Sequence, residues 1–412
     1  MTPRHSTRLG IGLGLAPLVL SLGGCVEDRE GITGTQSLAI ELVAPADPGT
    51  VDQRLPDSAR MVTVHVTAKD HDNEIDTSFN DPVRVYAQFL GTVTPDLNQM
   101  PLATIQMQNG VATNQEITLP FVYGPTTLWF DNGTGFGGDY EHGPIAGTSE
   151  TLWYRDPWIA DLQTPRDETA VDALSRTPLT DKQINVTESR YGARGRLVVT
   201  SVYAQGYTVA DVQCADEQGT PPCTSQAYDH LLVFTFSAPR DQHGRLLEPG
   251  REIERITGGL SEFNGLTEVG FPRTYAAEGP DDAPALHPER MPAPALFDPA
   301  WFGPLSSPDG MINFERNESG PIEIRNAVVC QLDDEYATFK QWKLDPAGEG
   351  GDCSRKRNVL NIITAGSDFA TDPATLVGRT LPSVVGILRP VNIGSFNVWI
   401  VYPRGGDDIV LQ

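Results

Sequence analysis

The clearest candidate for metal chemistry is an acidic loop between two expected strands. Alternating carboxylates can supply the oxygen ligands that Ca²⁺ prefers. The carboxylates of this loop belong to Asp70, Asp72, Glu74, Asp76 and Asp81. Their spacing departs from that of an EF-hand, because the glycine needed for its sharp turn would fall at Ile75. A solvated turn accounts for the same residues and is the interpretation that we favour. Calcium is therefore the only cofactor that the sequence leaves open.

A second candidate is a group of basic and aromatic residues near the carboxyl end. Single-stranded polymers can be bound by aromatic side chains that stack beside a basic groove. The residues that could do this are Lys340, Trp342, Lys343, Arg355, Lys356 and Arg357. Residues 320–412 contain nine basic and eleven acidic side chains, so this region is close to neutral. We therefore favour a buried Trp342 beside an exposed basic loop, and we do not expect nucleic acid as a partner.

Four cysteines could form disulfides or bind zinc. They are Cys214, Cys223, Cys330 and Cys353. Four cysteines allow three pairings. We predict the local pairing, Cys214–Cys223 and Cys330–Cys353, because it places one disulfide in each of two regions that repeat each other. A zinc site is the alternative, but no CxxC motif occurs and no histidine lies near Cys330 or Cys353. Disulfides of this kind are typical of exported proteins.

The sequence gives no catalytic residue. No HExxH, GxSxG or GxxxxGK(S/T) motif occurs. The net charge of −24 repels nucleic acid and anionic lipid at long range. The 33 prolines and 40 glycines favour strands and turns over long helices. We therefore expect an all-β protein that is not an enzyme.

Alternating hydrophobic residues predict strands from residue 37 to about residue 165. In Met61–Ala68, Val62, Val64 and Val66 share one face, and Pro82–Phe89 repeats the pattern. Asn109-Gly110 predicts a hairpin turn between Leu102–Met107 and Val111–Leu119. Short strands are also expected at Thr126–Phe130 and Thr151–Tyr154. Strands of this length and spacing predict an antiparallel sandwich. The segment resembles bacterial immunoglobulin-like domains of surface proteins. Two runs carry this resemblance, Asn109-Gly110-Val111-Ala112-Thr113 and Ile117-Thr118-Leu119-Pro120.

An internal repeat follows. The pattern from Gly250 to Leu260 returns without a gap from Gly378 to Leu388, and each copy leads to an aromatic-Pro-Arg triplet. The expected strands before the first copy are Leu197–Tyr203, Tyr207–Asp211 and Leu231–Phe236; those before the second are Ile322–Cys330, Thr338–Leu344 and Val359–Thr364. Five strands with a glycine-led turn into the fourth predict a small Greek-key barrel of the OB type.

The second copy carries a further resemblance. The runs Val384–Leu388, Phe396–Ile400, Pro403-Arg404 and Asp407-Asp408-Ile409 resemble the last strands of OB-like domains in secreted bacterial proteins, which often accompany nucleases. The first copy lacks the Asp-Asp-Ile tail. The whole layout also resembles lipoproteins of myxobacteria and their relatives. That resemblance implies a fold and a location, not an activity.

The amino-terminal residues have the layout of a secretory signal. Arg4 and Arg8 precede an apolar run, Leu9–Leu22, which is too short to span a bilayer. Leu22-Gly23-Gly24-Cys25 then resembles the lipobox of bacterial lipoproteins, in which the cysteine is lipidated and becomes the acylated amino terminus. The alternative is an ordinary signal peptide. In lipoproteins of this kind, an aspartate directly after the lipidated cysteine retains the protein in the inner membrane. Val26 occupies that position here, so the same resemblance implies sorting to the outer membrane. Either the periplasmic or the cell-surface face is possible.

These patterns give one organisation. The expected segments are a signal peptide (1–24), a lipidated tether (25–36), an immunoglobulin-like sandwich (37–165), a connector (166–192), an OB-like barrel (193–273), a Pro-rich linker (274–319) and a second OB-like barrel (320–412). The linker could also lie across a barrel as an insertion. Loss of the signal, which holds two basic and no acidic residues, would change the net charge from −24 to −26.

The function expected from this organisation is non-catalytic. We expect a lipid-anchored structural or binding protein of the outer membrane, whose partner is an envelope protein or an extracellular polymer. The alternative is a nucleic-acid- or glycan-binding module that acts through the second barrel. A hydrolase with a site that no motif reveals is the third hypothesis.

Overall fold

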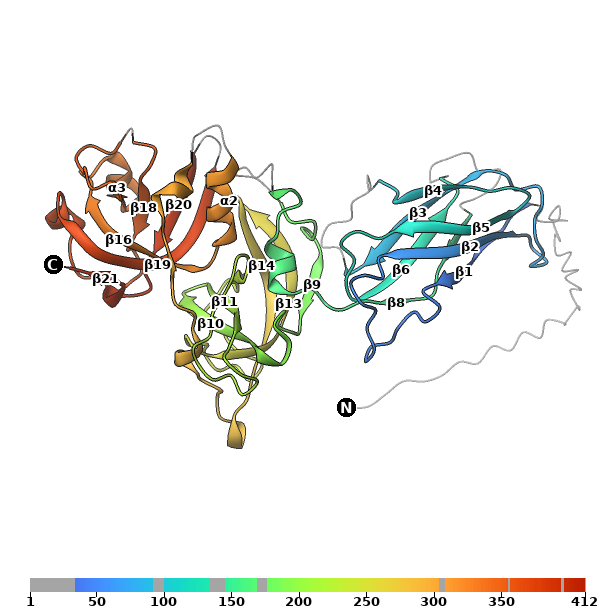
Figure 1. The fold of residues 1–412 in the computed structure, drawn as a ribbon, viewed down its shortest axis with the longest axis horizontal. Helices are drawn as coiled ribbons and strands as arrows, with labels where there is room; N and C mark the ends of the chain where they lie inside the picture. The colour runs from blue at the N-terminus through green and yellow to red at the C-terminus, as the bar shows by residue number, and fades with distance from the viewer. Residues whose placement is uncertain are drawn as a thin grey trace, which may run out of the picture.

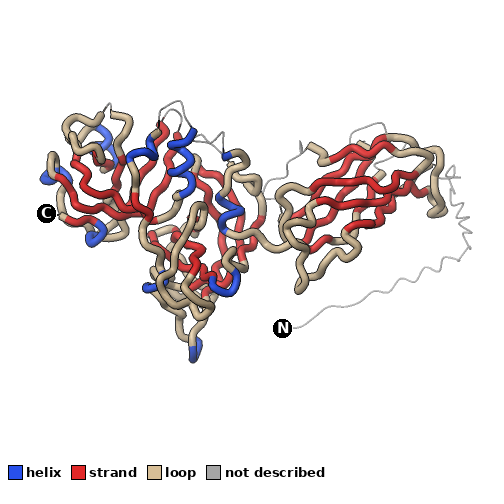
Figure 2. Tube along the Cα trace, in the orientation of Figure 1, coloured by secondary structure: helices blue, strands red, loops and turns tan. Residues whose placement is uncertain are grey.

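A computed structural model of the chain shows an all-β protein (Figures 1 and 2). It describes residues 34–91, 100–133, 145–168, 176–303, 308–354, 356–393 and 396–411. Strands form three bodies, one before residue 165 and two closed barrels after it. The signal peptide and most of the tether, including Cys25, lie outside the described residues. No helix in the described part of the chain has the length and apolar character needed to cross a bilayer.

The amino-terminal body consists of two antiparallel sheets. The first has the order β1-β2-β5, and the second has the order β4-β3-β6-β7, with β8 also paired to β6. Their bounds are β1 Ser37–Ala44, β2 Met61–Lys69, β3 Pro82–Phe89, β4 Ala103–Gln106, β5 Val111–Thr118, β6 Pro125–Asp131, β7 Ala146–Thr148 and β8 Leu152–Trp153.

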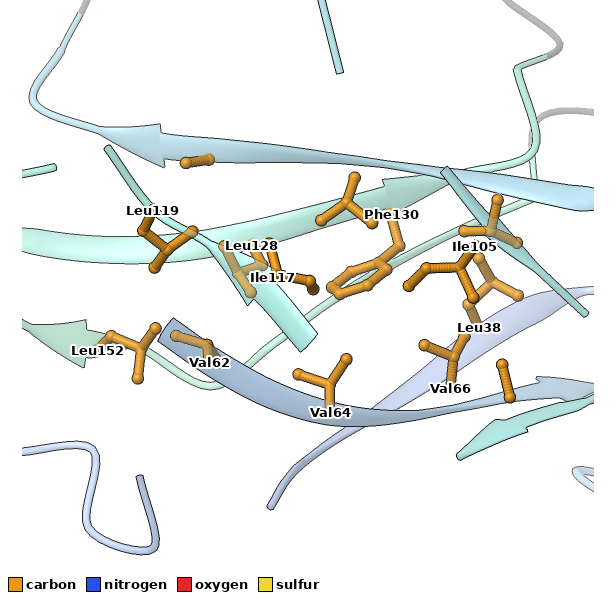
Figure 3. Packing of buried hydrophobic residues seen from close by; sticks show 14 of the residues in the cluster. Leu38, Val62, Val64, Val66, Ile105, Ile117, Leu119, Leu128, Phe130 and Leu152 are labelled. Carbon is orange, nitrogen blue, oxygen red and sulfur yellow. The ribbon is translucent and has the colours of Figure 1, made fainter. Parts of the chain in front are cut away.

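The inward faces of these two sheets form one hydrophobic core. Figure 3 shows Val62, Val64 and Val66 of β2 pointing toward Phe130 of β6, and all four side chains are fully buried. The alternation predicted for Met61–Ala68 is therefore confirmed, and it fixes the register because a slip by one residue would expose every valine.

The Asn109-Gly110 turn is present, but the predicted hairpin is wrong. Gln108 and Val111 pair across the turn, whereas β4 then joins β3 and β5 joins β2, in opposite sheets. Tertiary contacts hold the turn in this crossing position. The Gly110 N–H donates to the Phe79 carbonyl at 2.9 Å, and a Cβ at Gly110 would lie 2.3 Å from the Asp76 carbonyl oxygen.

The first barrel contains five strands that close on themselves. Its order is β10-β11-β12-β14-β13, with β13 paired back to β10 and a parallel pair between β12 and β14. The bounds are β10 Gly195–Tyr203, β11 Gly206–Gln213, β12 His230–Phe234, β13 Glu252–Phe263 and β14 Leu266–Ala276. The fifth strand thus extends three residues beyond the predicted end of the barrel at residue 273.

Residues 166–192 are more than the predicted connector. They contain β9 (Gln183–Val186), which pairs with Ile256–Gly259 of β13 and adds a sixth strand to the first barrel. The helix before it, α1 (Ile159–Gln163), buries Ile159 and Leu162 in the same core. A four-residue strand with only two buried side chains is too short to give a periodic signal.

The second barrel repeats the first. Its order is β16-β17-β18-β20-β19, with β19 paired back to β16 and a parallel pair between β18 and β20. The bounds are α2 Pro308–Arg316, β15 Ala295–Leu296, β16 Pro321–Val329, α3 Asp334–Phe339, β17 Gln341–Asp345, β18 Leu360–Ile363, β19 Thr380–Ile393, β20 Phe396–Tyr402 and β21 Ile409–Val410. Short 3₁₀ helices are η3 Gly192–Arg194, η4 Pro280–Asp282, η5 Pro288–Arg290, η6 Pro299–Phe302, η7 Pro373–Leu376 and η8 Gly406–Asp408.

The glycine-led turn of the repeat closes both barrels in the same way. The Gly250 N–H donates to the Val199 carbonyl at 2.8 Å, and the Gly378 N–H donates to the Val329 carbonyl at 2.9 Å. Both glycines have positive φ, +88° and +76°, a conformation that favours glycine over other residues. The sequence repeat therefore corresponds to a structural repeat.

The described part of the Pro-rich segment, residues 274–303 and 308–319, lies across both barrels. The Arg290 guanidinium pairs with Glu252 of β13, and the His287 N–H donates to the Gly250 carbonyl at 2.7 Å. Further along, β15 pairs with β16, and Phe297 is buried in the core of the second barrel. Of the two interpretations left open by the sequence, the insertion across a barrel is the one observed.

Candidate functional site

The predicted stacking residue of the second barrel is buried. Trp342 is 1% exposed and lies in the barrel core opposite Ile362 of β18. It cannot stack on a ligand from this position, so the buried Trp342 that we favour from the sequence is confirmed and its alternative role in ligand binding is not. Residues 341–345 are all buried, because β17 is covered on its inner face by the core and on its outer face by α3 and the residues around it.

The predicted basic side chains do not form one groove. The Lys343 ammonium, on a residue only 8% exposed, lies 2.6 Å from Asp333 and 2.8 Å from Glu335. Burial opposes its charge, but these two carboxylates outweigh burial and raise the pKa of Lys343. Lys356 pairs with Asp345 at 2.8 Å, and this hydrogen bond raises the pKa of Lys356. Both charges are thus neutralised within the barrel.

The remaining basic residues of this group are separate. Lys340 is exposed at the end of α3, with its ammonium 5.1 Å from the centre of the Tyr336 ring. Arg355 lies outside the described residues. Arg357 and Lys356 line a pocket of about 550 Å³ together with Asp345 and Glu349. The opposite charges on its wall suit neither a polyanion nor a polycation.

The acidic loop does not gather into a metal site. One Asp70 oxygen accepts hydrogen bonds from the N–H groups of Asp72 and Glu74, at 3.0 and 2.9 Å. Asp76 accepts from the hydroxyls of Thr35 and Ser78, and the Ser78 hydrogen bond is the main cause of its lowered pKa. These are turn-stabilising contacts. Within the described ranges, no group of three His, Cys, Asp or Glu side chains is placed to hold a metal ion.

Both predicted disulfides are present. Cys214 is bonded to Cys223 in the first barrel, and Cys330 is bonded to Cys353 in the second. All four cysteines are buried. Each disulfide closes a loop within one copy of the repeat, as the local pairing predicts.

An exposed cluster of phenylalanines on the first barrel was not predicted from the sequence. Phe271 is 82% exposed and Phe236 is 51% exposed, and their ring centres are 4.7 Å apart. The half-buried Phe234 packs edge-on against Phe236 at 4.5 Å. We call these three residues the phenylalanine patch. The one signal in the sequence was the aromatic-Pro-Arg triplet that contains Phe271.

Buried acids join the two barrels, and they too were not predicted. Glu318, which is 3% exposed, accepts a hydrogen bond at 3.0 Å from the N–H of Thr267 in β14. Burial, with the charges of Glu315 and Glu262, raises its pKa well above the ordinary value. Burial also raises the pKa of Glu262 to about 7. These carboxyls therefore lie at the junction in positions that disfavour their charged form.

The junction is closely packed. A Cβ at Gly320 would lie 2.5 Å from the ring of His230, whose pKa burial lowers to about 4. On the other side, the Arg389 guanidinium of β19 lies 3.9 Å from the centre of the Tyr203 ring in β10. The junction holds the barrels against each other and has the character of a structural interface.

Comparison with known proteins gives no relative. No family model matches the chain, and no curated protein or solved structure matches it significantly.

Proposed function

We propose that this chain is an exported, lipid-anchored, non-catalytic protein of a bacterial outer membrane that presents its barrels to a partner. The observation that carries the proposal is the run Leu22-Gly23-Gly24-Cys25 after an apolar segment, which resembles a lipobox. The two disulfides support it, because such bonds persist in oxidising compartments. An acyl-modified Cys25 with two or more chains would anchor the protein stably.

We further propose that the barrels are OB-like and that the amino-terminal body is immunoglobulin-like. In both barrels the strands lie in the order first, second, third, fifth, fourth, and the fourth strand pairs back with the first. The third and fifth strands are parallel. This arrangement supports the OB-like assignment. The orders β1-β2-β5 and β4-β3-β6-β7 support a Greek-key sandwich of immunoglobulin type. Here the fourth strand, β4, pairs with β3 in the second sheet, which accounts for the turn at Gly110 that crosses between the sheets.

The arrangement of the second barrel does not favour the alternative function there. Trp342 is buried, and the charges of Lys343 and Lys356 are paired. A polymer that stacks on aromatic rings would find no exposed tryptophan among these described residues. Any binding of this kind is better supported by the first barrel, whose phenylalanine patch is exposed.

Lipidation is tested by intact-mass analysis of the protein extracted from membranes. We expect cleavage before Cys25 and added acyl mass, whereas Cys25→Ser should stop lipidation and mis-sort or release the protein. Val26→Asp tests the sorting step, because it should retain the lipidated protein in the inner membrane. A wild-type chain that is cut elsewhere and is fully soluble would contradict the proposal.

A further inference from the structure

Phe271, the most exposed residue of the phenylalanine patch, is exposed because the backbone of β14 bulges. Phe271 and Pro272 oppose the single residue Gly258 of β13, where the register shifts. A Cβ at Gly258 would lie 2.7 Å from the Gly270 carbonyl oxygen, so glycine is required opposite the bulge. The additional residue in β14 directs the Phe271 ring away from the barrel.

Two of the three phenylalanines adopt an unfavourable backbone conformation. Phe271 has φ +49° and Phe236 has φ +60°. This left-handed region is sterically disfavoured for a bulky side chain. Strain of this kind persists where the surrounding structure imposes it, and it concentrates at ligand sites. The exposure of two large apolar rings is thus built into the fold of the first barrel.

The second barrel provides an internal comparison. Tyr402, the aromatic residue of its triplet, stays in register opposite Ile387 and lies 5.0 Å from the Arg389 guanidinium. The inserted 3₁₀ turn η8 brings Asp408 to Arg404, at 2.7 Å. The first copy has no such insertion, and its Phe271 is exposed. The two copies of the repeat therefore differ at this surface.

We propose that the phenylalanine patch binds an uncharged glycan, whose sugar rings stack on Phe271 and Phe236. This inference deepens the proposed binding function and rests on it. The C–H groups of a sugar ring carry slight positive charge, which complements the negative face of an aromatic ring. Phe271 offers such a face to solvent, because it is 82% exposed and among the described residues only the Phe236 ring packs against it.

The size of the patch favours a small ring over a protein partner. A phenylalanine side chain has an area of about 150–250 Å², so exposures of 82% and 51% leave an apolar area on the order of 250 Å². A stable protein interface buries about 800 Å² on each partner. The patch is well below this area, whereas it is comparable to the face of one or two sugar rings.

Charge favours a neutral ligand over a nucleic acid. The chain has a net charge of −24, which repels polyanions. Single-strand binding needs a basic groove beside the aromatic rings. Two polar side chains lie close to the patch along the chain or by contact: Gln205, whose amide reaches the Phe236 carbonyl at 3.4 Å, and the exposed Arg273 two residues beyond Phe271. Such groups can bond sugar hydroxyls at the rim of the patch.

The test uses the full-length protein and defined hexasaccharides. Calorimetric titration with cellohexaose, laminarihexaose and chitohexaose should detect binding of at least one sugar at millimolar or lower concentration. Phe271→Ala and Phe236→Ala should each weaken that binding about tenfold or more. Phe339→Ala and Phe263→Ala are matched controls, because both side chains are 61% exposed and lie outside the patch. The controls should bind as wild type, and all four variants should melt with wild-type cooperativity.

Several results would overturn the inference. One is the absence of binding to all three sugars; another is binding that Phe271→Ala leaves unchanged. Loss of oligothymidylate binding in Phe271→Ala would assign the patch to nucleic acid instead. A dimer in sedimentation experiments that Phe271→Ala dissociates would assign it to a second copy of the chain. None of these results depends on Cys25, so failure of the glycan inference is distinguishable from failure of the proposed anchoring.

Discussion

Substitution of a glycine in the fourth strand should destabilise a barrel, because two strands approach each other closely there. Gly386 of β19 faces the end of β20. A Cβ at Gly386 would lie 2.7 Å from the carbonyl carbon of Tyr402 and 2.8 Å from the backbone nitrogen of Pro403. Backbone atoms cannot rotate away as a side chain can. In Gly386→Ala the two strands must therefore separate by several tenths of an ångström.

The expected loss of stability is about 1–3 kcal/mol, the usual effect of an overpacked core. Gly386→Val should lose more, because its two additional methyl groups would enter the same space. Gly258 occupies the matching position in the first barrel, where a Cβ would lie 2.5 Å from a methyl group of Val269. Gly258→Ala should therefore destabilise the first barrel by a similar amount.

Gly270 is the matched control for Gly258. It lies on the neighbouring strand, and a Cβ there would have the Gly259 carbonyl oxygen, at 4.0 Å, as its nearest neighbour. Its φ is also not positive. Gly270→Ala should leave stability unchanged or increase it by about 0.4–1 kcal/mol, because alanine restricts the unfolded chain.

Hydrogen exchange measured by mass spectrometry separates the two barrels in the intact protein. Peptides from β19 and β20 should lose protection in Gly386→Ala, and peptides from β13 and β14 should lose it in Gly258→Ala. If both alanine variants were as protected as wild type, the close approach of the strands would be refuted. Equal losses in Gly258→Ala and Gly270→Ala would instead show that any side chain in this ladder is destabilising.

Three other properties can be tested in the same protein. Replacing Cys330 and Cys353 by serine should reduce the stability of the second barrel by about 3 kcal/mol, measured as the shift of its urea transition, and a Cys214–Cys223 double serine variant should leave that transition in place. Glu262 has a native pKa of about 7 against 4.5 in an unfolded chain, so between these pH values it takes up a proton on folding. The free energy of unfolding should therefore fall by up to about 3 kcal/mol as the pH rises from about 4.5 to about 7; Glu262→Gln should show a flatter pH profile than wild type, and identical profiles would contradict the raised pKa. Trp342→Ala should destabilise the second barrel by about 3–5 kcal/mol without changing any binding at the phenylalanine patch, and a loss no larger than that of Phe339→Ala would argue that Trp342 is not a core residue.

Local patterns in the sequence predicted much of the fold. Alternation located β2 and β3 because one face of each strand is buried, as Val62 and Val85 show. The repeated glycine-led pattern located the closing turns at Gly250 and Gly378. The local cysteine pairing followed from the same repeat.

The rest depended on contacts between distant residues. The pattern around Asn109-Gly110 specifies a turn, but it cannot tell which sheet the next strand will join. Lys343 lies on a strand that is covered on both faces. Its charge can be buried there because Asp333 and Glu335, from the preceding segment, pair with it. The exposure of Phe271 depends on a bulge that is defined only by pairing with Gly258. The burial of Glu318 requires both barrels to be in place.

The path of the Pro-rich segment has a consequence for dividing this protein into parts. Arg290 belongs to the packing of the first barrel, while Phe297, only seven residues later, belongs to the core of the second. A protease that cut upstream of Arg290 would remove this contact from the first barrel, and one that cut downstream of Phe297 would deprive the second barrel of a core side chain. Only a cut between Arg290 and Phe297 would leave both contacts in place. The boundary between the two barrels therefore falls within these few residues, and limited digestion or exchange of a barrel between proteins should yield a stable single barrel only if the chain is divided there.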